Sequence, residues 1–239
     1  MESFEHKLQK FDPGVVWLDG HNRVLALNTI ASSVLGVAVG DAVGSEILQL
    51  HPQKSRNKVQ WLLESASCPV TSPPPMTMMI NVPDRVLLIK VSKMFNAGEP
   101  VGTSMIFFDL TDVTTSPLLP DGGPDRLRQL FKLPVYRKSK VVLLDLKTVS
   151  HFKADGHYTT VYTENERYLC NLSLSDLEQR LDGTRFVRVH RSYMINVHYA
   201  TAFEKLDEQC TVVMSTVPEE HVPVSRSNLH KLKAMFGLT

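Results

Sequence analysis

The chain has 239 residues, of which 43% are hydrophobic and 21% are charged, and its formal net charge is +1. This composition is that of an ordinary globular protein, long enough for two modest domains at roughly 100 to 150 residues each. Charged residues interrupt every apolar run before it reaches the ~18 residues that a transmembrane helix needs, which excludes a membrane-spanning protein.

Two features of the sequence indicate where the protein is located: its N-terminal residues and its cysteines. The first residues, Met-Glu-Ser-Phe-Glu-His-Lys, contain no basic segment that leads into an apolar one, so we expect no secretory signal. Three cysteines, Cys68, Cys170 and Cys210, lie far apart and cannot all pair with one another. We therefore expect a cytoplasmic protein in a reducing compartment.

A stretch rich in proline and glycine, residues 114–124, divides the chain. We expect a first domain over residues 1–115, a linker over 116–132 and a second domain over 133–239. Up to residue 117 the chain has nine Lys and Arg against eleven Asp and Glu, a net charge of −2. The remainder has seventeen against fourteen, a net charge of +3, so the second part is the candidate for binding an anion.

The first part has the order two strands, helices, three strands. Asp19 to Asn22 supply turn residues for a hairpin within 14–28. A helix follows with Asn28 as its N-cap and ends at Gly36, and a second helix is predicted with Ser55 as its cap. The three further strands are predicted at residues 78–82, 85–91 and 103–110.

This order, with the Asp19-Gly20 turn and the spacing of Asn28, Ala31, Leu35 and Gly36, resembles a PAS domain over roughly residues 10–115. The resemblance implies a five-stranded antiparallel sheet with helices, a fold that holds ligands between the sheet and the helices. Many PAS domains bind no cofactor.

Five soft side chains, which can ligate haem iron, fall within 29 residues: His51, Cys68, Met76, Met78 and Met79. Each also has a purely structural interpretation. A histidine after the apolar run 47–50 is commonly a hydrogen-bonded residue at the boundary of an element. Methionines commonly fill gaps in a core, and Cys68 beside a proline can be an inert small hydrophobic residue. Taken singly, none of them identifies a cofactor.

The sequence of residues 50–59 and 68–83, taken together, resembles that of the RcoM-type carbon monoxide sensors, which are single-chain PAS-LytTR haem proteins. The resemblance implies a haem b iron with His51 as its permanent ligand. It implies Cys68 as the opposite ligand in ferric protein and Met78 in ferrous protein, with CO displacing Met78. A thiolate suits ferric iron and a neutral thioether suits ferrous iron. Met79 points to the other face of a strand, so only one of the pair can reach the iron.

The second part is predicted to be mostly β, with two short helices. Ser173 and Asp176 form a capping-box pattern before one helix, and Leu229, Leu232 and Phe236 follow the spacing of the last helix. The predicted strands cover residues 141–145, 148–153, 158–162, 167–169, 186–195, 199–203 and 210–214. The fold class is therefore α+β overall.

Four segments, residues 152–160, 174–181, 186–196 and 222–226, resemble the LytTR DNA-binding domain, and the resemblance covers 130–239. LytTR domains contact DNA through loops rather than through a recognition helix. The resemblance implies base contacts from His157, Arg191 and Arg226, of which an arginine suits guanine because its fork is bidentate. A loop arginine is otherwise a solvated charge, and His157 fits either role. Phosphate contacts are expected from Arg188, Lys153 and Lys138, whereas His190 is expected to support its strand.

The leading interpretation is a homodimeric transcription factor without enzymatic activity, in which a haem PAS domain senses CO and a LytTR domain binds promoter DNA to activate genes for CO oxidation. One alternative is a haem enzyme that handles a gas or a redox reaction, although no kinase, cyclase or Walker motif stands out. Another is a PAS-LytTR regulator that holds no haem.

Overall fold

In the computed structural model the chain forms two compact units, Met1–Thr111 and Asp112–Thr239. The structure describes residues 12–51, 53–65, 76–81, 84–116, 128–137, 140–156, 158–206 and 209–237, and each unit is considered by itself. Cys68, Lys138 and His157 lie outside the described residues.

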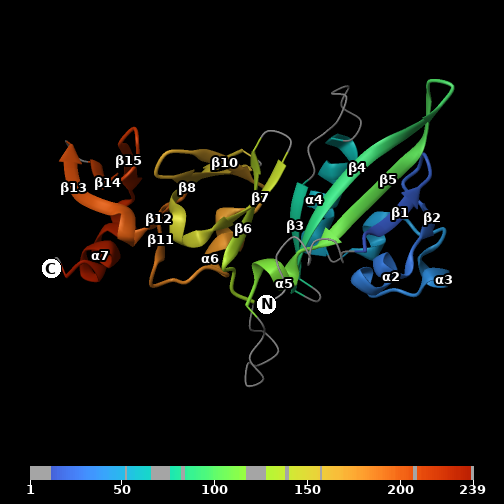
Figure 1. Cartoon of the computed structure of the whole chain (residues 1–239), viewed down its shortest axis with the longest axis horizontal. Coiled ribbons are helices and arrows are strands. Elements are labelled where there is room, and N and C mark those ends of the chain that lie inside the picture. The colour runs from blue at the N-terminus through green and yellow to red at the C-terminus, as the bar shows by residue number, and fades with distance from the viewer. Residues whose placement is uncertain are drawn as a thin grey trace, which may run out of the picture. The chain divides into compact units, whose positions relative to one another are not determined.

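The first unit contains a five-stranded antiparallel sheet (Figure 1). Its strands, in spatial order, are β2 (Val24–Leu27), β1 (Gly14–Leu18), β5 (Glu99–Asp109), β4 (Asp84–Asn96) and β3 (Met76–Asn81). Helices follow the first hairpin and precede the last three strands. The PAS architecture predicted for this part is therefore confirmed.

Local hydrogen bonds explain why the first elements form where the sequence predicts them. The Asp19 carboxylate accepts hydrogen bonds from the backbone N–H groups of His21 and Arg23, both at 2.8 Å, and closes the β1–β2 turn. The Asn28 side chain accepts from the N–H of Ala31 at 2.9 Å and caps α2 (Thr29–Leu35). Gly36 ends α2 with a φ of 68°, which glycine adopts without strain.

Three further helical segments connect β2 to β3: α3 (Val39–Ala42), a 3-10 helix (Ile47–Leu50) and α4 (Gln53–Ser65). The prediction that Ser55 caps the last of these was wrong. Ser55 lies within the first turn of α4, where its side chain is buried. The apolar face of α4 packs in one core with α2 and with the inner face of the sheet; this core includes Val59, Leu62, Leu63, Val34, Val16, Leu87, Ile89, Met105 and Phe107.

Strands β4 and β5 are longer than predicted, and their hairpin extends beyond the rest of the sheet (Figure 1). They pair from Leu87 opposite Asp109 to Asn96 opposite Glu99, with a shift of register between Met94 and Phe95. The turn between them uses Ala97 and Gly98, both with positive φ, which the apolar pattern used to predict strands does not detect.

The second unit contains a seven-stranded sheet in the order β11-β12-β8-β9-β10-β6-β7 and a three-stranded sheet, β13-β14-β15. The strands are β6 (Lys132–Arg137), β7 (Lys140–Asp145), β8 (Val149–Asp155), β9 (Tyr158–Thr163), β10 (Arg167–Cys170), β11 (Phe186–His190), β12 (Tyr193–Asn196), β13 (Ala200–Leu206), β14 (Gln209–Met214) and β15 (Glu220–Val224). Helices α6 (Leu174–Glu178) and α7 (Arg226–Met235) stand where they were predicted, and the Ser173 capping box is present. The predicted mostly β fold is confirmed.

Two details of the second unit differ from the prediction. The single strand predicted over 186–195 is a hairpin, because the chain turns back at Arg191 and Ser192. Strands β6 and β15 were not predicted, since each contains a proline, Pro134 and Pro223, that lowers the strand signal.

The stretch expected to be a linker is described only at its two ends, and both ends pair with each other. A short helix, α5 (Thr111–Thr114), leads into Thr115, which forms an antiparallel bridge with Leu130. Leu130 in turn donates its N–H to the carbonyl oxygen of Arg180 at 2.9 Å. These ends are therefore part of the second unit's hydrogen-bonded structure.

Candidate functional site

His51 ends the 3-10 helix of the first unit and is buried, with 6% of its surface exposed. Its ring Nδ1 lies 2.8 Å from the carbonyl oxygen of Ile47, one turn earlier. The Arg56 side chain donates to the carbonyl oxygen of His51 at 3.1 Å. Both the backbone and the ring of His51 are thus fixed by local hydrogen bonds.

These surroundings favour a neutral imidazole with one defined tautomer. Burial lowers the pKa of His51, and the positive charge of Arg56 lowers it further. A carbonyl oxygen only accepts, so Nδ1 carries the proton and donates it to Ile47. The lone pair of Nε2 is then available for a metal. Histidines that ligate metals are commonly oriented by a second-shell hydrogen bond of this kind.

His51 is the polar residue of an otherwise apolar cavity between the helices and the sheet. The other lining residues are Val16, Val34, Leu35, Ile47, Leu87, Ile89, Met105 and Phe107. The cavity offers about 10 Å³ to a water-sized sphere, which is room for about one water. Met105 is a thioether that the sequence analysis did not single out; its place in the alternating pattern of β5 was the available signal.

The backbone of β3 distinguishes the two adjacent methionines. Met78 pairs with Leu87, and Met79 pairs with Val86. Residues directly opposite each other in an antiparallel pair share a face of the sheet. Leu87 lines the cavity with His51, so position 78 is on the cavity face of the sheet and position 79 is on the other face.

Within the described part of the chain, no group of three or more His, Cys, Asp or Glu is arranged to hold a metal ion. A single buried histidine that faces an apolar cavity is instead a donor set suited to a prosthetic group which brings its own metal and its other ligands.

Three of the residues expected to contact DNA, Lys153, Arg191 and Arg226, lie on neighbouring segments of the second unit. Ala154, near the end of β8, donates its N–H to the carbonyl oxygen of Ser192 at 2.8 Å. Ser225, the residue before α7, donates to the carbonyl oxygen of Val189 at 2.8 Å. These bonds place the β11–β12 turn with Arg191 between the end of β8 and the start of α7 with Arg226. Arg191 and Arg226 are both exposed.

Lys153, Arg188 and His190 differ in how far the domain's own contacts hold their side chains. Lys153 stands opposite Tyr193, with its Nζ 5.8 Å from the centre of the ring, and remains near the exposed edge of this loop cluster. Arg188 is half-buried and makes hydrogen bonds within the domain. His190 accepts a hydrogen bond from the N–H of Ser192 at 3.2 Å, as expected for a residue that supports the turn.

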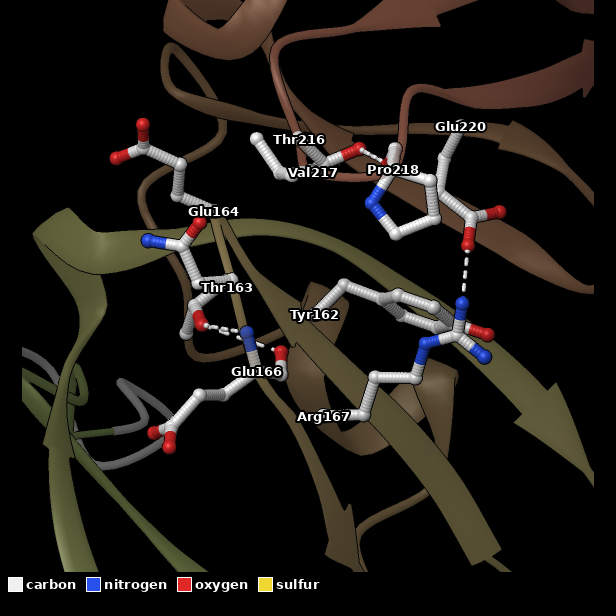
Figure 2. Close-up of a pocket in the computed structure, with 10 residues that line it drawn as sticks. Tyr162, Thr163, Glu164, Glu166, Arg167, Thr216, Val217, Pro218 and Glu220 are labelled. Atoms are coloured by element: carbon white, nitrogen blue, oxygen red, sulfur yellow. Dashed lines mark hydrogen bonds and ion pairs between the residues drawn. The ribbon is translucent and has the colours of Figure 1, made fainter.

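A second hollow lies at the opposite end of β9, between the β9–β10 turn and the loop before β15 (Figure 2). Figure 2 shows Arg167 lying over the ring of Tyr162 and reaching Glu220, to which it donates at 2.7 Å. In the same hollow Thr163 bonds to the backbone of Glu166. These bonds join the turn to the three-stranded sheet, so the hollow is explained by the structure of the domain.

Comparisons with known proteins show the family of the chain. Residues 139–237 match the LytTr DNA-binding domain. Over 99% of the chain, the sequence is 52% identical to the heme-containing CO-sensing transcriptional regulator RcoM 1 of Paraburkholderia xenovorans, covering 94% of that protein. The chain belongs to the RcoM family.

Another relative of this RcoM-family chain is the CO-responsive transcriptional regulator RcoM of Rhodospirillum rubrum, with 30% identity over the whole of both chains. Among solved structures, a LytTr DNA-binding domain from Bacillus cereus covers 44% of the chain and 96% of that domain, with 23% identity and a TM-score of 0.41. Family membership makes the protein a transcriptional regulator with a LytTR domain and not an enzyme, so the alternative of a haem enzyme is excluded.

No described helix of this RcoM-family chain is long and apolar enough to cross a membrane.

Proposed function

We propose that this protein senses CO with a haem b held by its PAS unit and, when CO is bound, binds promoter DNA as a homodimer in the cytoplasm to activate genes for CO oxidation. The observation that supports the sensor half is His51, a buried neutral imidazole in an apolar cavity whose Nδ1 is held by Ile47. The names of the relatives, which are CO-sensing regulators, support the same function.

The residues fit haem in their donor chemistry. His51 supplies a nitrogen ligand, and the apolar lining suits the faces of a porphyrin. The cavity of about 10 Å³ is far smaller than a porphyrin, so haem binding requires the side chains around His51 to move apart.

When bound, the haem supplies an iron that takes CO. His51 would hold it in both oxidation states, Cys68 would hold it in ferric protein, and Met78 would hold it in ferrous protein. The position of Met78 on the cavity face of the sheet supports this choice over Met79. A thioether is a weak ligand, so Met78 would give way to CO while His51 would stay bound.

The place of Met78 in the sheet suggests what its release changes. Strand β3 is at the edge of the five-stranded sheet and has one neighbour, β4. An edge strand is held by one ladder of hydrogen bonds only. Freeing Met78 would therefore act on a strand that is hydrogen-bonded to the sheet on one side only.

In the second unit, we propose that Arg191 and Arg226 read base edges and that His157 assists them. Both arginines are exposed, Arg191 in the β11–β12 turn and Arg226 at the start of α7, and the bond from Ser225 to Val189 joins these two segments. Lys153 and Lys138 are proposed to contact phosphates, which position the protein without specifying sequence. A homodimer presents this set twice to a repeated site.

The alternative to this proposal is a PAS-LytTR regulator whose PAS unit holds no haem. A visible absorption spectrum of the purified protein separates the two. The first proposal expects a Soret band that shifts on reduction with dithionite and again on addition of CO, together with CO-dependent enrichment of specific duplexes from a random-sequence DNA library. Purified protein that takes up no haem when it is supplied would contradict the first proposal and leave the second.

A further inference from the structure

We infer that Arg188 is a positioning residue, which clamps the Arg191 turn to helix α6 and thereby aims Arg191 at DNA. This inference rests on the proposed role of Arg191 in base reading. It replaces the expected phosphate contact of Arg188 with a role inside the domain.

The guanidinium of Arg188 joins two segments that are distant in sequence. One Nη donates to the carbonyl oxygen of Arg191 at 2.6 Å, and Nε reaches the carbonyl oxygen of His190 at 3.4 Å. The other Nη donates to Ser175 Oγ at 3.2 Å and to Glu178 Oε2 at 3.3 Å. Arg188 thus links the backbone carbonyls of His190 and Arg191 to side chains of α6.

This arrangement leaves little of Arg188 for a phosphate. A guanidinium has five N–H donors, and these four bonds use all three of its nitrogens. Three quarters of the side chain surface is covered, and the Glu178 carboxylate beside it repels a phosphate. The Arg191 side chain, in contrast, is exposed, while its own carbonyl is the group that Arg188 holds.

A fixed turn matters because base reading depends on orientation more than phosphate contact does. A bidentate arginine reads guanine only when both of its donors are aligned with two acceptors. A phosphate contact tolerates much larger displacement, since it is mainly a charge interaction. Loosening the turn should therefore reduce preference for the specific duplex and leave general attraction to DNA nearly unchanged.

Helix α6 is itself well anchored for this role. Its Ser173 capping box fixes its start, and Leu174 and Leu177 are buried beneath it. The two side chains that meet Arg188 are on the same short helix, three residues apart, and so lie on one face. The clamp holds the turn against a rigid support.

The test compares Arg188→Gln, Ser175→Ala and Glu178→Gln in the full-length, haem-loaded, CO-bound protein. The probes are the duplex that wild-type protein selects from a random-sequence library and a scrambled duplex of equal composition, each at several salt concentrations. Glu164→Gln is the control, because it removes an equal charge at the β9–β10 turn, at the other end of β9. Thermal melting and the Soret band check that each variant folds.

We expect Arg188→Gln to lower the preference for the selected duplex by at least about fivefold, with the salt slope unchanged. Glu178→Gln and Ser175→Ala should lower the preference in the same direction by less, and Glu164→Gln should leave it at the wild-type value. If Arg188→Gln does not fold, Glu178→Gln and Ser175→Ala provide the test.

A phosphate role predicts different results. Loss of Arg188 would then weaken binding to both duplexes alike and lower the salt dependence of the affinity by about one unit of slope. Glu178→Gln would strengthen binding to both duplexes. Either result overturns the inference, as does an unchanged preference in all three variants. Wild-type protein that selects no duplex would instead overturn the proposed base reading itself.

Discussion

Met78 of β3 stands directly opposite Leu87 of β4, and Leu87 lines the same cavity as His51. In Met78→Leu, which keeps volume and hydrophobicity, we expect an altered ferrous spectrum and tighter CO binding, because an internal ligand that competes with CO has been removed. CO titration of the reduced protein measures this.

Two matched variants make this prediction specific. Met79→Leu is the control at the neighbouring position of β3, and Met105→Leu tests the thioether found among the described residues that line the cavity. Both should keep the wild-type ferrous spectrum and CO affinity. If the effect appears in Met105→Leu instead, the ligand comes from β5 and the assignment of Met78 is wrong.

His51→Ala should lose haem or hold it weakly. The reason is that a cofactor attached through its iron depends most on the permanent ligand, and Ile47 has already fixed the imidazole for that role. Haem content per chain and the Soret spectrum are the measurements. His21→Ala, at an exposed position in the β1–β2 turn, is the control. Normal haem content and spectrum in His51→Ala would contradict the assignment.

Cys68→Ser should change the ferric spectrum and preserve CO-dependent DNA binding, because a thiolate suits ferric iron and has no part in the ferrous cycle. Spectra of oxidised and reduced protein, followed by DNA binding with and without CO, provide the check. Cys210→Ser is a suitable control, since Cys210 is a free cysteine of the second unit. Loss of the CO response in Cys68→Ser would give Cys68 another role.

Arg191→Ala and Arg226→Ala should each reduce the binding free energy for the selected duplex by on the order of 1–3 kcal/mol. Each should also reduce the preference of the protein for this duplex over scrambled DNA. Lys153→Ala should weaken binding to both duplexes alike and lower the slope of affinity against salt concentration by about one. Affinities at several salt concentrations distinguish the two patterns. Equal losses on both duplexes for Arg191→Ala would make Arg191 a phosphate contact.

His151 should make the second unit sensitive to acid. Its ring is 1% exposed and stacks on Tyr162 with centroids 4.0 Å apart. Burial lowers the pKa of His151 to about 3, helped by the charges of Arg167 and Lys153. Below about pH 6.5 the histidine is protonated in the unfolded chain but stays neutral in the folded chain. The free energy of unfolding therefore falls by up to ~1.4 kcal/mol for each pH unit as the pH is lowered from about 6.5 to about 3.

Thermal melting over this pH range measures the effect. His151→Phe, which keeps a flat ring against Tyr162, should flatten the acid side of the profile. His198→Gln, at an exposed position, should leave the profile as it is in the wild type. An equal slope in His151→Phe and wild-type protein would assign the acid sensitivity to other groups.

The sequence by itself determined the elements whose signals are local. Asp19, Asn28 and Ser173 make their turn and cap bonds with residues two to four positions away, so a local pattern of residues is enough to predict these bonds. The PAS and LytTR resemblances likewise rest on short blocks of sequence, and the family comparison supports them. The errors have a local cause too, since Pro134 and Pro223 weaken the strand signal of two segments that nevertheless pair with the strand next to them in the chain.

Only the tertiary structure decided which side chains work together. Pairing of β3 with β4 brings position 78 to the face of the sheet on which His51 and Leu87 line one cavity. The clamp of the Arg191 turn through Arg188 to Glu178 requires contacts between side chains of two separate elements, β11 and α6. Such contacts depend on strand register and on packing across the domain, which no local pattern of residues encodes.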